Sequence, residues 1–281
     1  MEQMKRVLCI HDLSCVGRCS LTVILPVLSA MGVQACPLPT ALLSTHTGGL
    51  GTPAVIRTEA FCRDALAHWE RLSLSFDCVY SGYLADAADA ELVRRAFAQN
   101  PDACKLVDPV LADHGKLYRG VTPALCSAMT DLCKMADVLC PNVTESAVLL
   151  GLEPDDSPFD RAQLAERIER LHAAFPRARG LVITGARLSD GTHGNAFWQE
   201  DNSFSFLPFD PVPQSYPGTG DLFASVLAGA LTRGLRLADG VELAAGFVAR
   251  AAAETLRMGA DPRFGTAFER VLSDLTKPKE G

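Results

Sequence analysis

Residues 217–225 read Pro-Gly-Thr-Gly-Asp-Leu-Phe-Ala-Ser, and an apolar run of helical character continues to Leu231. Two glycines bracket Thr219, and Asp221 follows them directly. A glycine loop before a helix presents main-chain N–H groups, and the helix N-terminus favours an anion there. Asp221 places a negative charge beside that anion. The conflict is explained if the carboxylate takes a proton from a hydroxyl group that attacks a phosphate.

The rest of the chain alternates short apolar strands with helices of similar length. This alternation predicts an α/β fold whose central, mostly parallel sheet carries helices on both faces. The expected strands are 7–10, 33–36, 77–81, 104–107, 138–140 and 181–184. The expected helices are 20–31, with Ser20 as the cap, 57–72, 86–99, 122–134, 144–150, 161–174, 222–231 and 239–258. A hairpin is expected from 195–199 and 204–207, with the turn at 200–203.

Composition places the chain among ordinary globular proteins. It has 281 residues, of which 48% are hydrophobic and 21% charged, and no Pro/Gly/Ser-rich linker interrupts it. We therefore expect residues 1–281 to form a single domain. The formal net charge is −7 and no dense Lys/Arg run occurs, so neither a nucleic acid nor an anionic membrane is expected as a partner.

Cysteine usage and the N-terminal residues indicate the compartment. Ten cysteines are scattered along the chain without a Cys-x-x-Cys pair, which is typical of free thiols in a reducing environment. The first residues lack the long apolar stretch of a signal peptide, and no segment is long enough to span a bilayer. The sequence therefore predicts a cytoplasmic protein.

Polar residues follow the expected strands. Asp12, Tyr83, Asp108, Asn142 and Gly185 each lie where a strand is expected to end. In parallel α/β sheets ligands bind beyond the carboxyl ends of the strands, so these five positions predict one binding edge.

Two acidic positions have both a structural and a chemical interpretation. Glu145, in Asn-Val-Thr-Glu after Pro141, is either a first-turn residue of a helix or a carboxylate that orients water around a magnesium ion. Asp108, in Asp-Pro-Val, is either part of a surface loop or a group that positions metal and phosphate. The glycine-containing segment that follows Asp108 is a candidate mobile cover over a nucleotide.

The other candidate site residues also have two interpretations each. Asp221 is either the cap of the helix that follows or a catalytic base. His46 and Thr47 stand beside glycines, either as ordinary loop residues or as groups that cover a small polar ring. His11 and Asp12 carry the same two interpretations.

Together these stretches resemble the ribokinase superfamily and, within it, the pyridoxal kinase group. The resemblance covers nearly the whole chain. It rests on the opening Asp-Leu-Ser-Cys-Val-Gly at 12–17, Ser-Thr-His-Thr-Gly-Gly at 44–49, Ser-Gly-Tyr-Leu at 81–84, Asp-Pro-Val at 108–110, Gly-Lys-Leu-Tyr at 115–118, Pro-Asn-x-x-Glu at 141–145 and Gly-Thr-Gly-Asp at 218–221.

The resemblance implies ATP-dependent phosphorylation of the 5′-hydroxymethyl group of pyridoxal, pyridoxine or pyridoxamine. Asp221 is then the catalytic base, and an anion hole for the transferring phosphoryl group is formed by Gly218, Thr219 and Gly220. Asp108 and Glu145 are the implied magnesium-organising residues. The implied nucleotide-binding residues are Asp108, Asn142, Glu145, Thr184 and Gly185. The implied substrate-binding residues are Asp12, His46, Thr47 and Tyr83.

The same resemblance implies a homodimer and leaves open whether K⁺ is needed besides Mg²⁺. Asp12 stands where many pyridoxal kinases have serine, so its carboxylate is expected to favour a protonated ring nitrogen or an amino substituent. Two alternatives remain at this level. One is a hydroxymethylpyrimidine kinase of thiamine biosynthesis, with the same fold and chemistry, and the other is a non-catalytic protein that binds B6 or a nucleotide.

Overall fold

The computed structural model describes residues 4–198 and 203–276. The chain divides into two compact units, and each is described by itself. The first unit comprises Met1–Tyr80 and Pro211–Gly281, and the second comprises Ser81–Asp210. The single domain predicted over the whole chain stays a prediction.

The first unit is built on buried strands at the N-terminus. β1 (Arg6–Ser14) and β2 (Gln34–Leu43) pair in parallel, from Arg6 opposite Gln34 to Ser14 opposite Leu43. β4 (Cys78–Ser81), whose last residue opens the second unit, lies on the other side of β1, and β3 (Val55–Arg57) is an antiparallel edge strand. Residues 7–12 of β1 are all buried, so this strand lies in the core.

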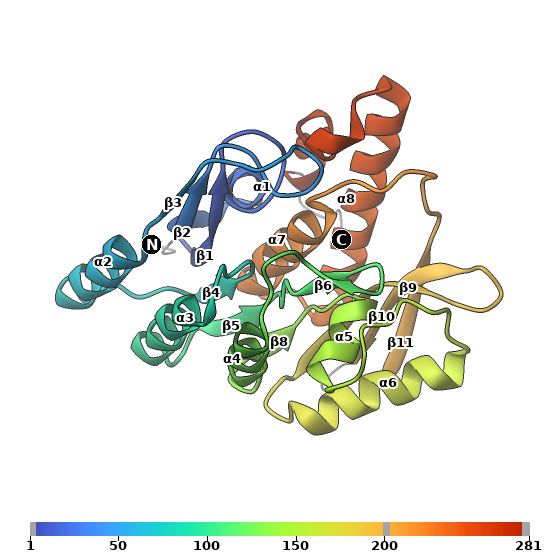
Figure 1. The fold of residues 1–281 in the computed structure, drawn as a ribbon, viewed down its shortest axis with the longest axis horizontal. Coiled ribbons are helices and arrows are strands. Elements are labelled where there is room, and N and C mark those ends of the chain that lie inside the picture. Colours follow the sequence, from blue (N-terminus) through green and yellow to red (C-terminus); the bar gives the residue numbers. More distant parts are fainter. Residues whose placement is uncertain (1–3, 199–202, 277–281) are drawn as a thin grey trace. The chain divides into compact units, whose positions relative to one another are not determined.

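Helices from both ends of the chain pack on this unit (Figure 1). α1 (Leu21–Ala30) packs on β1, β2 and α7 (Thr219–Thr232), while α2 (Glu59–Arg71) packs on β2. α7 and α8 (Leu237–Met258) pack together, and short 3₁₀ turns follow at Pro262–Phe264, Phe268–Arg270 and Leu272–Leu275. α7 is apolar almost throughout and buried on nearly every side, which a helix at the centre of a core requires.

The second unit carries its own section of sheet. β5 (Cys104–Val107), β8 (Val138–Leu139) and β9 (Gly180–Arg187) pair in parallel. β10 (His193–Trp198) and β11 (Phe204–Phe209) continue the sheet antiparallel. A separate small hairpin is formed by β6 (Ala112–Asp113) and β7 (Lys116–Leu117).

Helices α3 (Ala87–Gln99), α4 (Pro123–Cys133), α5 (Val143–Leu149) and α6 (Arg161–Ala174) cover this section. Each begins at a side chain that accepts a main-chain N–H of the first turn, and these N-caps are Asp86, Thr122, Asn142 and Asp160. The helix starts are therefore determined locally. Among the described residues, none of the helices has the length and apolarity needed to cross a bilayer.

The α/β class with a mostly parallel sheet is confirmed, and the strand at 104–107 and the helix at 161–174 have the predicted bounds. Several other boundaries were wrong. β1 continues through residues 11–14, beyond the strand predicted at 7–10, because their backbone goes on pairing with β2 up to Leu43. β2 and β9 are longer than predicted, and Arg57 belongs to β3 instead of α2. The hairpin is present, but 199–202 lie outside the described residues.

Candidate active site

The start of α7 is shaped by a glycine that no other residue can replace without a clash. Gly218 is its N-cap and has φ of 81°, the left-handed region that glycine alone enters freely. A Cβ at this position would lie 1.9 Å from the carbonyl oxygen of Arg18. Among the described residues no side chain caps the helix, so its first N–H groups remain open to an anion.

Asp221 is the third residue of α7, so the capping interpretation of Asp221 was wrong. Its Oδ2 accepts a 2.8 Å hydrogen bond from the main-chain N–H of Ser20. Burial raises the pKa of Asp221 to about 7, and the charge of Asp12 adds to the rise, while the Ser20 hydrogen bond opposes it. A carboxyl group with this pKa takes up and releases protons at neutral pH, as a general base must.

Asp12 lies inside β1 with 4% of its surface exposed. Its Oδ1 accepts a 2.5 Å hydrogen bond from the Ser20 hydroxyl, and its Oδ2 accepts a 2.9 Å hydrogen bond from the Ser14 hydroxyl. Burial raises the pKa of Asp12, and the two serine hydroxyls oppose that rise. Asp12, Ser14, Ser20 and Asp221 are called the Asp221 cluster below.

Ser20 precedes α1 as predicted, but it does not cap that helix. Its φ of 53° is left-handed, which is uncommon for a residue other than glycine. In this conformation its hydroxyl is bonded to Asp12 and its N–H to Asp221. The sequence did not indicate this role, because Asp12 and Asp221 lie 8 and 201 positions away from Ser20. Local sequence patterns do not predict hydrogen bonds between residues so far apart.

His46 joins three segments of the first unit. Its Nδ1 accepts the N–H of Gly48 at 3.0 Å, so Nε2 carries the proton and donates to the carbonyl of Arg263 at 2.7 Å. The ring fills the space above Gly17, where a Cβ would lie 2.2 Å from a ring carbon. Both ring nitrogens are therefore used inside the protein. Thr47, beside it, is exposed.

In the second unit, Asn142 and Glu145 form a capping box at the start of α5. Glu145 Oε2 accepts the N–H of Asn142 at 2.8 Å, and Oε1 accepts the N–H of Leu111 at 3.1 Å. Burial, and then the charge of Asp108, raise the pKa of Glu145 well above its usual range, against these N–H bonds. Asp108, Asn142 and Glu145 are called the Glu145 cluster below.

The Glu145 cluster fits a magnesium ion held through water. Asp108 and Glu145 are 6% and 3% exposed, and two buried like charges are costly unless a cation offsets them. Mg²⁺ binds few carboxylates and keeps several waters. Oε1 of Glu145 accepts the main-chain N–H groups of Leu111 and Ala112, while Oε2 accepts that of Asn142 alone, so Oε2 keeps a lone pair for a bound water. Among the described residues no group of three or more metal-binding side chains forms a complete cage.

The other predicted nucleotide residues adjoin this cluster. Thr184 donates its N–H to the carbonyl of Pro141 and forms a bridge with Asn142. Gly185 follows inside β9 with φ of 68°, and its N–H donates to Asn195 at 3.1 Å. Tyr83 follows β4 and is half-buried. The segment predicted as a mobile cover forms the hairpin of β6 and β7, and its mobility stays a prediction.

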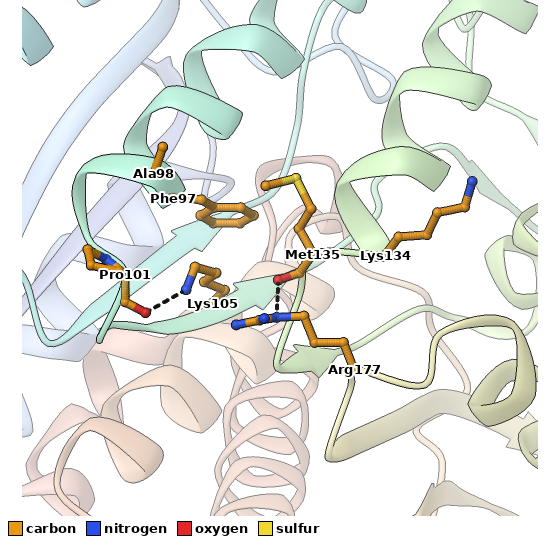
Figure 2. Close-up of a pocket in the computed structure, with 7 residues that line it drawn as sticks. All are labelled: Phe97, Ala98, Pro101, Lys105, Lys134, Met135 and Arg177. Atoms are coloured by element: carbon orange, nitrogen blue, oxygen red, sulfur yellow. Dashed lines mark hydrogen bonds between the residues drawn. The ribbon is translucent and has the colours of Figure 1, made fainter.

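A cavity of about 400 Å³ elsewhere in the second unit is lined by three cationic side chains and two large apolar ones, Phe97 and Met135 (Figure 2). Lys105 donates to the carbonyl of Pro101 at 3.0 Å, and Arg177 to that of Met135 at 3.0 Å. Lys134 points away from the others in Figure 2 and pairs with Asp131. These cations satisfy carbonyls and carboxylates near helix C-termini. The cavity therefore offers no argument for a phosphate site.

The chain is similar to known kinases over most of its length. A family model described as phosphomethylpyrimidine kinase matches residues 25–264. The crystal structure of pyridoxal kinase from Lactobacillus plantarum is 36% identical, with a TM-score of 0.89, and covers 97% of each chain. A Bacteroides thetaiotaomicron protein, in an orthorhombic crystal form with pyridoxal, is 32% identical with a TM-score of 0.92, covering 99% of this chain and 98% of that one. Pyridoxal kinase PdxY of Pseudomonas aeruginosa is 29% identical, covering 82% of this chain and 81% of its own.

Proposed function

Since the chain belongs to the phosphomethylpyrimidine kinase family, we propose that it transfers the terminal phosphoryl group of ATP to the 5′-hydroxymethyl group of pyridoxal, pyridoxine or pyridoxamine. The similarity to pyridoxal kinases over nearly the whole chain supports a B6 vitamer as the acceptor. The fold is ribokinase-like, as the sequence resemblance implies.

The observation that carries the proposal is the position of Asp221. It lies in the first turn of a glycine-led helix, and its pKa of about 7 is poised for proton transfer at neutral pH. A protein that only binds phosphate gains nothing from a carboxylate there, since the charge repels the ligand. This argues against the non-catalytic alternative.

In the proposed reaction Asp221 accepts the proton of the hydroxymethyl group while that oxygen forms a bond to the γ-phosphorus. The bond between the γ-phosphorus and the bridging oxygen breaks, and ADP leaves with that electron pair. The open N–H groups at Gly218, Thr219 and Gly220 donate to the oxygens of the transferring group. A Cβ placed on Gly220 would have no atom within 4 Å, so the approach to this turn is unobstructed.

The Glu145 cluster is proposed to serve the nucleotide side. Asp108 and Glu145 would hold Mg²⁺, with at least the Glu145 contact made through water. The ion supplies charge neutralisation on the β- and γ-phosphate oxygens. Asn142 keeps Glu145 in place through the capping box, and Thr184 and Gly185 are the proposed contacts to the phosphates or the adenine.

The substrate ring is proposed to meet Asp12, Thr47 and Tyr83. Asp12 uses one lone pair on each oxygen for the serines and keeps others for a ring N–H or an amino group. His46 has both nitrogens engaged, so we assign it the task of shaping this pocket by packing instead of donating to the substrate.

The test is a set of initial rates with ATP and four acceptors in parallel: pyridoxal, pyridoxine, pyridoxamine and hydroxymethylpyrimidine. Products are identified by mass and by the position of the phosphate. Phosphorylation of a vitamer at the 5′ oxygen is the expected result. Turnover of none of the vitamers would contradict the proposal.

The second candidate is hydroxymethylpyrimidine kinase, which the description of the family model favours. The same assay decides between the two candidates. A strong preference for the pyrimidine would change the assigned substrate and leave the assigned catalytic residues as they are. The homodimer, the cytoplasmic location and the use of K⁺ stay predictions from the sequence.

A further inference from the structure

We propose that Ser20 is a positioning residue of this site, which sets the spacing of the two carboxylates by holding Asp12 with its hydroxyl and Asp221 with its main-chain N–H. The inference rests on the proposed function and deepens it. In this role Ser20 links Asp221, the proposed base, to Asp12, the carboxylate proposed to contact the substrate ring.

The geometry of Ser20 supports this role. The two hydrogen bonds measure 2.5 Å to Asp12 Oδ1 and 2.8 Å to Asp221 Oδ2, and both acceptors are carboxylate oxygens. Hydrogen bonds to charged groups are the strong ones. In the described part of the chain, Ser20 alone donates to both carboxylates.

The backbone of Ser20 is unusual in a way that fits the same role. A left-handed φ of 53° is unfavourable for a residue with a Cβ, and glycine would be the default choice. A glycine would keep the N–H to Asp221 but lose the hydroxyl to Asp12. The strained serine therefore retains a bond that the relaxed residue cannot make.

The groups around the two carboxylates are few. Asp12 on β1 faces the hydroxyls of Ser14 and Ser20, and His46 acts on it weakly. Asp221 on α7 faces Ser20 and the charge of Asp12, and the thiol of Cys19 lies near both carboxylates. Ser20 hydrogen-bonds to both carboxylates, and its hydroxyl bonds to Asp12. Removing this hydroxyl therefore acts directly on Asp12.

The test compares S20A and S20G with the same substitutions at Ser73, which is exposed and also has φ of 53°. If the hydroxyl holds Asp12, both Ser20 variants raise KM for the vitamer by about tenfold or more, since a bond to a charged group is lost. We expect kcat to fall less, because the N–H to Asp221 survives. S73A and S73G leave both constants at wild-type values.

A merely structural role predicts a different pattern. Glycine would then relieve the backbone strain and leave KM unchanged or lower, whereas alanine would not. Opposite effects of S20A and S20G on KM, or no effect of either, would overturn the inference.

Two NMR measurements test the inference without any turnover. In the wild-type protein the amide proton shift of Ser20 should follow the titration of Asp221, and in D221N the transition that belongs to Asp221 should be lost. The carboxyl carbon of Asp12 should titrate at a higher pH in S20A than in the wild type. If the wild type phosphorylates no vitamer, the proposed function fails, and these two titrations still decide the role of Ser20. An Asp12 titration that S20A does not move, or a Ser20 amide that shows no transition with Asp221 in the wild type, refutes it.

Discussion

Asp12 and Asp221 interact through their charges, although one lies on β1 and the other on α7. Burial is the larger cause of the raised pKa of Asp221, and the negative charge of Asp12 adds to it. With a pKa of about 7, Asp221 is about half protonated at neutral pH, so it is less repelled by the phosphates of ATP than a fully ionised carboxylate would be. The raised pKa of Asp221 therefore explains how a carboxyl group can lie beside a site that binds an anion.

The first prediction concerns pH. Asp221 must be ionised to accept the proton, so kcat/KM should rise with pH and level off above about 7, where Asp221 is ionised. Below that pH it should fall by about tenfold per unit, since one proton inactivates the base. The D12N variant removes a negative charge, so its acid limb should move to lower pH. A profile that is flat between pH 5 and 8 would count against Asp221 as the base.

The second prediction separates function from stability at Asp221. D221N should lower kcat by about 10² to 10⁴, the usual worth of a general base. It should still bind ATP and the vitamer, because Asn keeps an oxygen for the Ser20 N–H. Wild-type turnover by D221N would make the assignment of the base wrong.

The same variant should be more stable than the wild type above neutral pH. The folded pKa of Asp221 is raised from 3.8 to about 7, so ionisation in the folded state costs free energy that the unfolded chain avoids. That cost is absent below about pH 4, grows as the pH rises to about 7 and is constant above it. A rise of the pKa from 3.8 to about 7 corresponds to about 4 kcal/mol of unfolding free energy at most. Because the side chain of Asp221 is partly exposed, we expect about 2 kcal/mol. Urea unfolding of both proteins at pH 5 and 8 measures it, and an equal difference at the two pH values would contradict it.

Local signals in the sequence were sufficient for much of this fold. The helix starts at Asp86, Thr122, Asn142 and Asp160 follow from capping chemistry that involves only the next three residues. Of the predicted strand-end residues, Asn142 forms the capping box with Glu145, and the charge of Asp108 acts on the same glutamate.

Long-range hydrogen bonds explain what the sequence did not reveal. Ser20 looked like a cap because a serine before an apolar helix usually is one, but Asp12 competes for its hydroxyl. His11 and Asp12 looked like loop residues because polar side chains usually leave a sheet. They are buried strand residues, since parallel pairing with β2 extends to Ser14. The edge strand β3, only three residues long and wholly exposed, has no periodicity to detect.

The third prediction concerns magnesium. E145Q can keep the capping box, because its one carbonyl oxygen can accept the N–H of Asn142. It removes the negative charge beside Asp108, and its NH2 group cannot accept the N–H groups of Leu111 and Ala112. We expect the Mg²⁺ concentration for half-maximal rate to rise several-fold. Magnesium titrations of the initial rate at fixed ATP measure this.

A natural control for this variant exists in α6. There the same box is formed by Asp160 and Gln163, with Oε1 of Gln163 accepting the N–H of Asp160 at 2.8 Å. Q163E makes the reverse exchange in an exposed box and should leave the magnesium titration unchanged. If E145Q also leaves it unchanged, Glu145 is a helix-end residue alone.

The last prediction compares three glycine-to-alanine variants. In G218A the new Cβ would meet the Arg18 carbonyl at 1.9 Å, so the start of α7 must move and both stability and turnover should be lost, with a cost of at least about 3 kcal/mol. G259A shares the left-handed conformation, with φ of 61°, but has no atom within 4 Å, so it should cost only about 1–2 kcal/mol. G220A lies in open space inside the helix and should gain about 0.5–1 kcal/mol. Any fall in its kcat/KM for ATP would then report crowding of the phosphoryl group, because the fold is intact. Denaturant unfolding and initial rates on the same three proteins decide the matter, and a G218A protein as stable and active as G259A would show that the tight turn is not required.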